Sequence, residues 1–304
     1  MNQLRPELLG LGDQLLAQVP NPFFGLVGGG VLAQPAVQRG QLLRPFPHYN
    51  SVAATNAAVA NSIYHALQTR LEKRFSAGFS LLAAYTFSKT ITDVADGLWN
   101  QPAGDVRNWH CRACDRAVSS YDQPHRFVTN VTYELPLGKG KTFGSGWGGA
   151  PQLLLGSWQV NGILTLSKGM PLRFYVPQNT CFCFGGGQKP DSTGVNANLG
   201  SERTINRWFD TAQFRQPAQF TFGNLGRNIG TVRGDGAKVL DFSLFKSFRF
   251  REALEFEFRA EAFNLSNTPL FGDPGTTINT PQFGIVNAQE NSPRQVQLGL
   301  KILF

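Results

Sequence analysis

Arg294–Phe304 reads RQVQLGLKILF, and it alternates apolar and polar residues up to an aromatic end. Successive side chains of a strand point to opposite faces, so the alternate apolar residues share one face. These residues are Val296, Leu298, Leu300, Ile302 and Phe304. A tilted strand of about 9 to 11 residues crosses a bilayer, where every backbone group must be paired. The stretch alone predicts a membrane barrel strand or a half-buried strand of a soluble sandwich.

The same period of two recurs in six further stretches of the chain. They are 67–75, 79–87, 127–135, 158–166, 240–248 and 254–262. The first two are separated only by Ser76-Ala77-Gly78, which predicts a hairpin with a very short turn. Together with the terminal stretch, these segments predict about seven antiparallel strands. The predicted fold class is all-β, and specifically a segment of a large transmembrane β-barrel that is incomplete on its own.

Composition fits this fold better than a helical membrane protein. The 304 residues have a mean hydropathy of −0.19, and no run approaches the 18 or so apolar residues that a membrane helix needs. Barrel strands are neutral in hydropathy because half of their residues face a wet lumen. The 25 Phe and 33 Gly residues are typical of many strands joined by irregular connections.

Aromatic residues of the apolar faces fall into two groups along the predicted strands. One group lies beside the shorter connections or the chain end: Phe75, Phe79, Tyr133, Trp158, Phe248 and Phe304. The other group lies beside a long connection: Tyr85, Phe87 and Phe127. Two aromatic rings that bound an aliphatic band are typical of outer-membrane barrels, where they mark the two interfaces.

Connection lengths predict how the chain is oriented. Long external loops are expected near 90–123, 168–237 and 267–293, whereas the turn at Arg251-Glu252 is short. Residues 1–61 are expected to form an external loop and the lead-in to the first strand, and 62–304 the barrel strands. A short amphipathic helix is expected before Pro20. An odd number of strands does not close a usual single-chain barrel, so we expect the sequence to be the C-terminal part of a longer protein.

Four stretches also resemble the C-terminal barrel of Oar-like TonB-dependent receptors. They are Leu42–Pro47 (LLRPFP), Ser62–Lys89 (SIYHALQTRLEKRFSAGFSLLAAYTFSK), Asp122–Gly138 (DQPHRFVTNVTYELPLG) and Arg259–Pro274 (RAEAFNLSNTPLFGDP). The resemblance implies an outer-membrane barrel of about 22 strands with a plugged lumen. It further implies an N-terminal plug that contacts the TonB complex, often preceded by a carboxypeptidase-regulatory-like domain. Neither part occurs in this sequence, so contact with TonB is expected only through such an absent region.

The resemblance also implies that the last strand is the handle for the barrel-assembly machinery. Its apolar row, Val296 to Phe304, would then be the assembly signal. The other expected partners are outer-membrane lipid and lipopolysaccharide.

Two cysteine pairs occur in the expected external loops. Cys111 and Cys114 have the spacing of half a zinc knuckle or of a redox dithiol, and Cys181 and Cys183 are a possible distant partner pair. Oxidising surroundings favour disulfides over a metal site, and the connectivity stays open. We therefore predict loop disulfides and no metal ligand.

The net charge of +8 permits several partners. Nucleic-acid binding is not predicted, because the basic residues are dispersed and the aromatics lie on the apolar face. Arg70, Arg74 and Arg259 are expected on the polar face, where they would form a charged lumen wall. His48, His65, His110 and His125 form no triad or metalloprotease pattern, so we predict no enzyme, no catalytic residue and no cofactor.

The expected function is the barrel part of a receptor in the outer membrane of a Gram-negative-type bacterium, which binds and imports a solute. A surface or adhesion barrel without active transport is the first alternative. A secreted soluble β-protein is the second.

Overall fold

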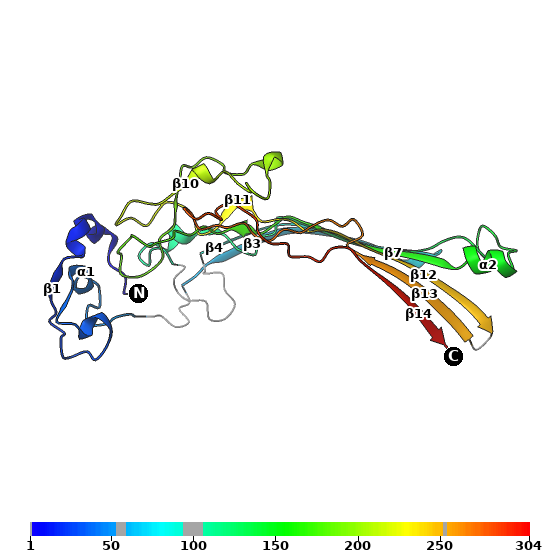
Figure 1. The fold of residues 1–304 in the computed structure, drawn as a ribbon, viewed down its shortest axis with the longest axis horizontal. Coiled ribbons are helices and arrows are strands. Elements are labelled where there is room, and N and C mark those ends of the chain that lie inside the picture. The colour runs from blue at the N-terminus through cyan, green and yellow to red at the C-terminus, as the bar shows by residue number, and fades with distance from the viewer. Residues whose placement is uncertain (1, 53–58, 94–105, 252–253) are drawn as a thin grey trace.

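The computed structural model describes residues 2–52, 59–93, 106–251 and 254–304. Its main feature is one antiparallel eight-stranded sheet with seven long strands, which carries folded segments at one end (Figure 1). None of the helices in these ranges is both long and apolar enough to cross a membrane. The molecule is mostly β, with few helices, as the alternation predicts.

The seven long strands pair in the order β3-β4-β6-β7-β12-β13-β14. Their bounds are β3 Ser62–Ser76, β4 Phe79–Thr92, β6 His125–Glu134, β7 Trp158–Ser167, β12 Lys238–Arg251, β13 Leu254–Phe263 and β14 Gln295–Leu303. All seven agree with the stretches expected from the period of two. The eighth strand, β5 (Ala117–Val118), pairs with the end of β4 and was not expected. Each long strand thus lies beside its predecessor among the long strands, which is an up-and-down arrangement.

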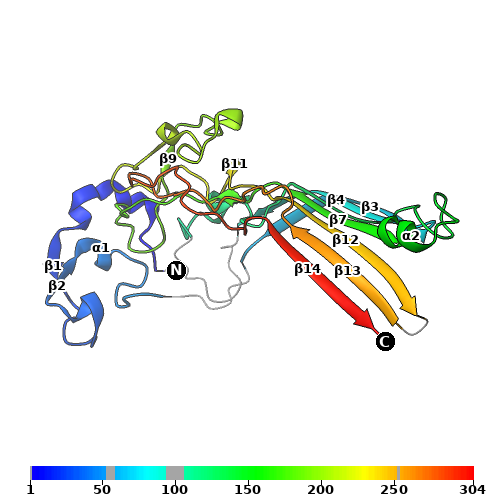
Figure 2. The same ribbon diagram turned by 45° about the vertical axis from the view of Figure 1, so that its right-hand side comes forward.

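The sheet is not closed. Strands β3 and β14 form its two edges, and the described residues contain no pairing between them. The sheet curves along its width in the view of Figure 2. It is therefore a partial β-barrel, as expected.

The predicted short hairpin joins β3 to β4. Ser76 pairs with Phe79, so the turn consists of Ala77 and Gly78 alone. Both have positive φ, 52° and 76°, as a type I′ turn requires. The turn predicted at Arg251-Glu252 includes residues outside the described ranges.

The two ends of the sheet differ. One end, called the turn end below, carries the β3–β4 turn, helix α2 (Gly149–Leu155) and the C terminus, whereas the N terminus lies near the opposite end of the molecule (Figure 1). At the opposite end lie the described parts of 2–61, 93–124, 168–237 and 264–294, which we call the loop body.

Short elements of the loop body include two further strand pairs, β11 (Ile229–Arg233) with β8 (Pro171–Leu172) and β10 (Phe214–Arg215) with β9 (Asp191–Ser192). They surround an aromatic core in which the Phe174, Phe209, Phe214 and Phe283 rings contact one another. Phe209 is fully buried there. This part of the loop body also contains three 3₁₀ helices: η4 Arg112–Asp115, η5 Gly200–Glu202 and η6 Thr211–Gln213.

The N-terminal segment forms a small lobe of the loop body. Its elements are η1 Pro6–Leu15, β1 Gln18–Pro20, η2 Gly30–Ala33, β2 Ala36–Gln38 and α1 Arg39–Leu42, and β1 pairs with β2. The expected short helix is present as the 3₁₀ helix η1, which is interrupted at Gly12 (φ 55°, ψ −131°). Leu4, Leu9 and Leu15 bury their side chains against Cys181 and Cys183, which fixes the lobe to the long 168–237 loop.

Candidate functional site

The apolar face of the sheet is continuous from one edge to the other. One row of directly opposed residues crosses all seven long strands: Lys73, Leu81, Val131, Gly162, Phe242, Ala262 and Val296. Large apolar side chains of this face are open to the surroundings, with Leu298 69% and Leu300 63% exposed at one edge and Leu71 63% exposed at the other. In water this surface would be costly, whereas lipid tails match it.

The opposite face is polar through the same strands. Its most polar row crosses six of them: Ser80, Thr132, Asn161, Ser243, Glu261 and Gln297. Arg259 forms an ion pair with Glu257, and its guanidinium lies over the Phe245 ring. Two apolar residues, Leu82 and Ile163, also lie on this face. The face is therefore charged and wettable, as the wall of a barrel lumen is.

Two of the predicted girdle aromatics contact each other at the turn end, and two more contact other residues there. The Phe79 and Tyr133 rings meet edge to face at 6.1 Å, and Phe248 stacks on Phe256 at 5.4 Å. The Trp158 Nε1 donates a hydrogen bond to the Leu154 carbonyl of α2 at 2.9 Å. An indole with a polar tip and an apolar ring suits a membrane–water boundary. The assignment of these rings to an interface remains a prediction.

The second predicted group lies toward the loop body. Tyr85 and Phe127 are directly opposed on neighbouring strands, and Phe87 is opposed to His125. The Tyr85 hydroxyl and the His125 Nδ1 are 2.8 Å apart, and the Phe87 ring lies 5.1 Å from the imidazole. His125 thus belongs to this aromatic group, although the alternation of apolar residues does not indicate it.

Two lysines stand on the apolar face at the turn end. Lys246 lies directly opposite Trp158; its ammonium lies over the Trp158 ring and donates to the Gly156 carbonyl. Lys73 donates to the Ser76 carbonyl and lies over the Phe79 ring. Lysines near the ends of membrane segments place their charge at the interface in this way. Lys246 was missed because it interrupts an otherwise apolar row.

The last strand occupies one edge of the sheet. Val296, Leu298, Leu300 and Ile302 pair through β14 with residues of β13 and remain exposed. Phe304 follows β14 and is fully exposed. The edge position leaves one side of β14 available to another strand. Its role as an assembly signal remains a prediction.

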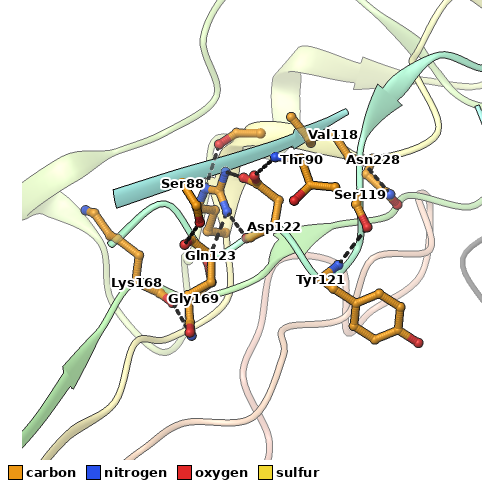
Figure 3. A network of polar contacts seen from close by, with 12 residues as sticks. Ser88, Thr90, Val118, Ser119, Tyr121, Asp122, Gln123, Lys168, Gly169 and Asn228 are labelled. Atoms are coloured by element: carbon orange, nitrogen blue, oxygen red, sulfur yellow. Dashed lines mark hydrogen bonds and ion pairs between the residues drawn. The ribbon is translucent and has the colours of Figure 1, made fainter. Parts of the chain in front are cut away.

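A network of polar contacts around the buried Asp122 holds the loop body against the sheet (Figure 3). The Arg233 Nη2 of β11 lies 2.6 Å from the Asp122 Oδ2, and the other carboxylate oxygen accepts from the Thr90 backbone N–H at 2.7 Å. Arg233 also donates to the Gly169 carbonyl at 3.2 Å. Asp122 is 1% exposed, and its carboxylate accepts hydrogen bonds from two segments, β4 and β11. The network fixes β4, β11 and the 119–123 segment to one another.

The Cys111–Cys114 pair forms a disulfide next to the buried Asp115, and Cys114 itself is exposed. Arg107 donates to the Cys114 carbonyl at 2.5 Å and to the Leu225 carbonyl at 3.1 Å. Its Nε lies 3.9 Å from the Asp115 carboxylate. Burial raises the pKa of the Asp115 carboxyl, and the Arg107 guanidinium acts in the opposite direction.

Cys181 and Cys183 are free thiols in the structure, whereas the expected loop disulfides, with their connectivity open, include these two cysteines. Both are buried in the N-terminal lobe's contact, and the Cys183 Sγ donates to the Gly185 carbonyl at 3.1 Å. The hydrogen bond to Cys183 and burial raise the pKa of the Cys181 thiol. Their sequence spacing gave no sign that they are packing residues, which free cysteines often are. Within the described ranges, no group of three or more His, Cys, Asp or Glu side chains could hold a metal ion.

Comparison with known proteins identifies the family. The profile of the outer membrane beta barrel domain family matches residues 1–297. The chain therefore belongs to this family, and its two-faced sheet is that of an outer-membrane β-barrel protein. No curated protein and no solved structure matches the chain.

Proposed function

We propose that the chain is the barrel part of an Oar-like TonB-dependent receptor, which binds a solute at the cell surface and imports it across the outer membrane. The proposal includes the expected partners: lipid and lipopolysaccharide at the apolar face, the barrel-assembly machinery at β14, and TonB through a plug. It includes no enzymatic activity of the barrel.

The observation that carries the proposal is the combination of a two-faced sheet with a folded loop body at one end. Short external loops would suffice for a passive wall. Here the loop body instead has its own aromatic core around Phe209 and a second core around Leu15. Rigid loops on a barrel are suited to holding a ligand above a lumen.

The open edges support a larger barrel. Lipid does not hydrogen-bond the free backbone groups of β3 and β14, so each edge needs a further strand in the membrane. The polar face of so small a sheet segment then lines only part of a wide lumen. A wide, plugged lumen is typical of 22-stranded transporters.

Uptake by whole cells tests the proposal. We would compare the solutes removed from a complex medium by the parent strain, a strain lacking the gene, and a strain with inactive TonB. The proposal predicts at least one solute that both mutants leave in the medium and the parent removes. The complemented deletion strain is the control, because it should recover this uptake.

The alternative of a surface or adhesion barrel predicts a different outcome. Loss of attachment in the deletion strain, with every solute taken up as in the parent, would overturn import and favour adhesion. Outer-membrane fractionation of the same strains reports whether the protein reached its membrane.

A further inference from the structure

The N-terminal lobe contains a cavity of about 900 Å³. Its walls come from η2, β2 and the segment after α1, and Phe184 of the long 168–237 loop closes one side. The Phe184 ring packs against Gly40, at a spot where any Cβ would collide with it. The cavity is therefore formed by two segments distant in sequence and held at a fixed width.

Arg44 is the charged residue in the wall of this cavity. It is only 9% exposed, and no carboxylate of the described residues forms an ion pair with it. Its Nε donates to the Asn2 carbonyl at 2.6 Å, and its Nη1 donates to the Gln41 Oε1 at 2.6 Å and to the Asn50 carbonyl at 3.0 Å. These neutral oxygens orient the guanidinium and leave its charge uncompensated.

Energetically, this is an unusual position for a cation. Charged groups are almost never buried without an opposite charge, because removing them from water is expensive. Burial accordingly lowers the pKa of Arg44, and no negative group offsets that effect. The planar guanidinium keeps one edge, its Nη2, for which no described residue is an acceptor. A carboxylate oxygen can accept a charge-assisted hydrogen bond from this Nη2 and offset the charge of the guanidinium.

The remaining wall supplies neutral polar and apolar groups. Gln34 and Gln38 carry amides that both donate and accept hydrogen bonds, and both side chains are exposed in the cavity region. Val31 and the Phe184 ring add apolar surface. A ligand with one carboxylate and several neutral polar groups would satisfy all of these at once.

We propose that this cavity binds a carboxylate-bearing ligand, with Arg44 as the residue that holds the carboxylate. Two sources have the required chemistry: the C-terminal end of a short peptide and an acidic sugar. The site lies within the loop body, between the N-terminal lobe and Phe184, so it does not depend on whether the barrel imports its ligand.

Titration calorimetry on the full chain, extracted in detergent from outer membranes, tests this inference. The peptide arm compares acetyl-trialanine with its C-terminal amide, and the sugar arm compares galacturonate with galactose. In at least one arm we expect the acid to bind at least about tenfold more tightly than its neutral counterpart. The arm that responds identifies the source.

Three variants locate the site. Arg44→Gln removes the charge, but it also removes hydrogen bonds within the lobe. Val31→Trp fills the cavity from an exposed position without touching those bonds. Both should weaken acid binding at least about tenfold. Arg39→Gln makes the same charge change at an exposed side chain that donates only to Gln14 and lies outside the cavity wall, so it should bind like the parent.

Equal binding of acid and neutral probes in both arms, or no binding in either, would overturn the proposal. So would acid binding that Val31→Trp leaves unchanged. Cellular uptake does not enter this experiment, so its failure is distinct from a failure of the import function.

Discussion

The sheet and the loop body bury their apolar residues in different ways. Every large apolar side chain that is fully buried in the described residues lies outside the seven long strands, in segments such as Leu4–Leu32 and Leu172–Val232. The long strands instead expose residues such as Leu71 and Leu300. A soluble protein places its core between its elements, as the loop body does. The sheet lacks such a core, and its exposed apolar face is suited to contact with lipid.

The largest loss of stability is expected from a substitution inside the loop body. Phe209→Ala removes a fully buried ring from the contacts with Phe174, Phe214 and Phe283. Such a truncation costs about 3–5 kcal/mol. Protease digestion of intact cells should cut the loop body of this variant faster, while the barrel stays in the membrane.

Phe24→Ala is the matched control, because Phe24 is 56% exposed. It should be digested like the parent. Failure of the Phe209 variant to insert at all would show that the sheet and the loop body fold as one unit, against the comparison above.

The next largest loss is expected when a charge is placed on the apolar face of the sheet. Leu300→Arg places a charge on the apolar face of β14, at a cost of about 2–4 kcal/mol in the middle of a bilayer. Gln297→Arg makes a similar change on the polar face of the same strand. The fraction of protein that runs as folded barrel on unheated gels should fall for the first variant only. Equal losses would mean that both faces have the same surroundings.

A smaller effect is expected at the chain end. Phe304 contributes no protein contact that would hold the fold, because it is fully exposed. Phe304→Ser should therefore leave the stability of the inserted protein unchanged and lower the amount inserted into the outer membrane. Quantitative immunoblots of membrane fractions measure this in the full-length protein. Unchanged insertion would remove Phe304 from the assembly signal.

The smallest effect depends on pH. Burial raises the pKa of Asp115 above its unfolded value of about 3.9, so the folded loop body holds this proton more tightly than the unfolded chain does. Its contribution to stability is therefore greatest below that value and falls as pH rises through the folded pKa. Asp115→Asn should remove this fall.

Hydrogen exchange in the 106–116 segment at several pH values measures this contribution. Asp13→Asn, at an exposed carboxylate, should keep the pH dependence of the parent. The same pH dependence in both variants would show that Asp115 is not its source.

The sheet was predictable from the sequence because the alternation of apolar and polar residues is complete within each strand. Leu67 to Phe75 and Phe79 to Phe87 define their faces without any distant contact, and the register then follows from the two-residue turn. The strand ends were less predictable: β4 continues to Thr92, where the Asn61 carbonyl accepts a hydrogen bond from its hydroxyl. That bond joins residues 31 apart in the sequence.

The loop body was not predictable in this way. Phe174, Phe209 and Phe283 share a core although no period relates them. Arg44 belongs to a short motif whose cavity depends on Phe184, far along the chain. Cys181 and Cys183 were expected in loop disulfides but serve as packing residues. In each case the decisive contact is between segments whose order in the sequence says nothing of their distance in space.

Photolabelling from within the hydrocarbon layer tests most directly whether lipid covers the apolar face. A lipid-soluble carbene reagent, applied to outer membranes that contain the protein, should tag Leu300 and Phe256 and spare Gln297 and Glu257, which lie on the other face of the same two strands. Tags on Gln297 and Glu257, with Leu300 and Phe256 unmodified, would contradict the assignment of the two faces.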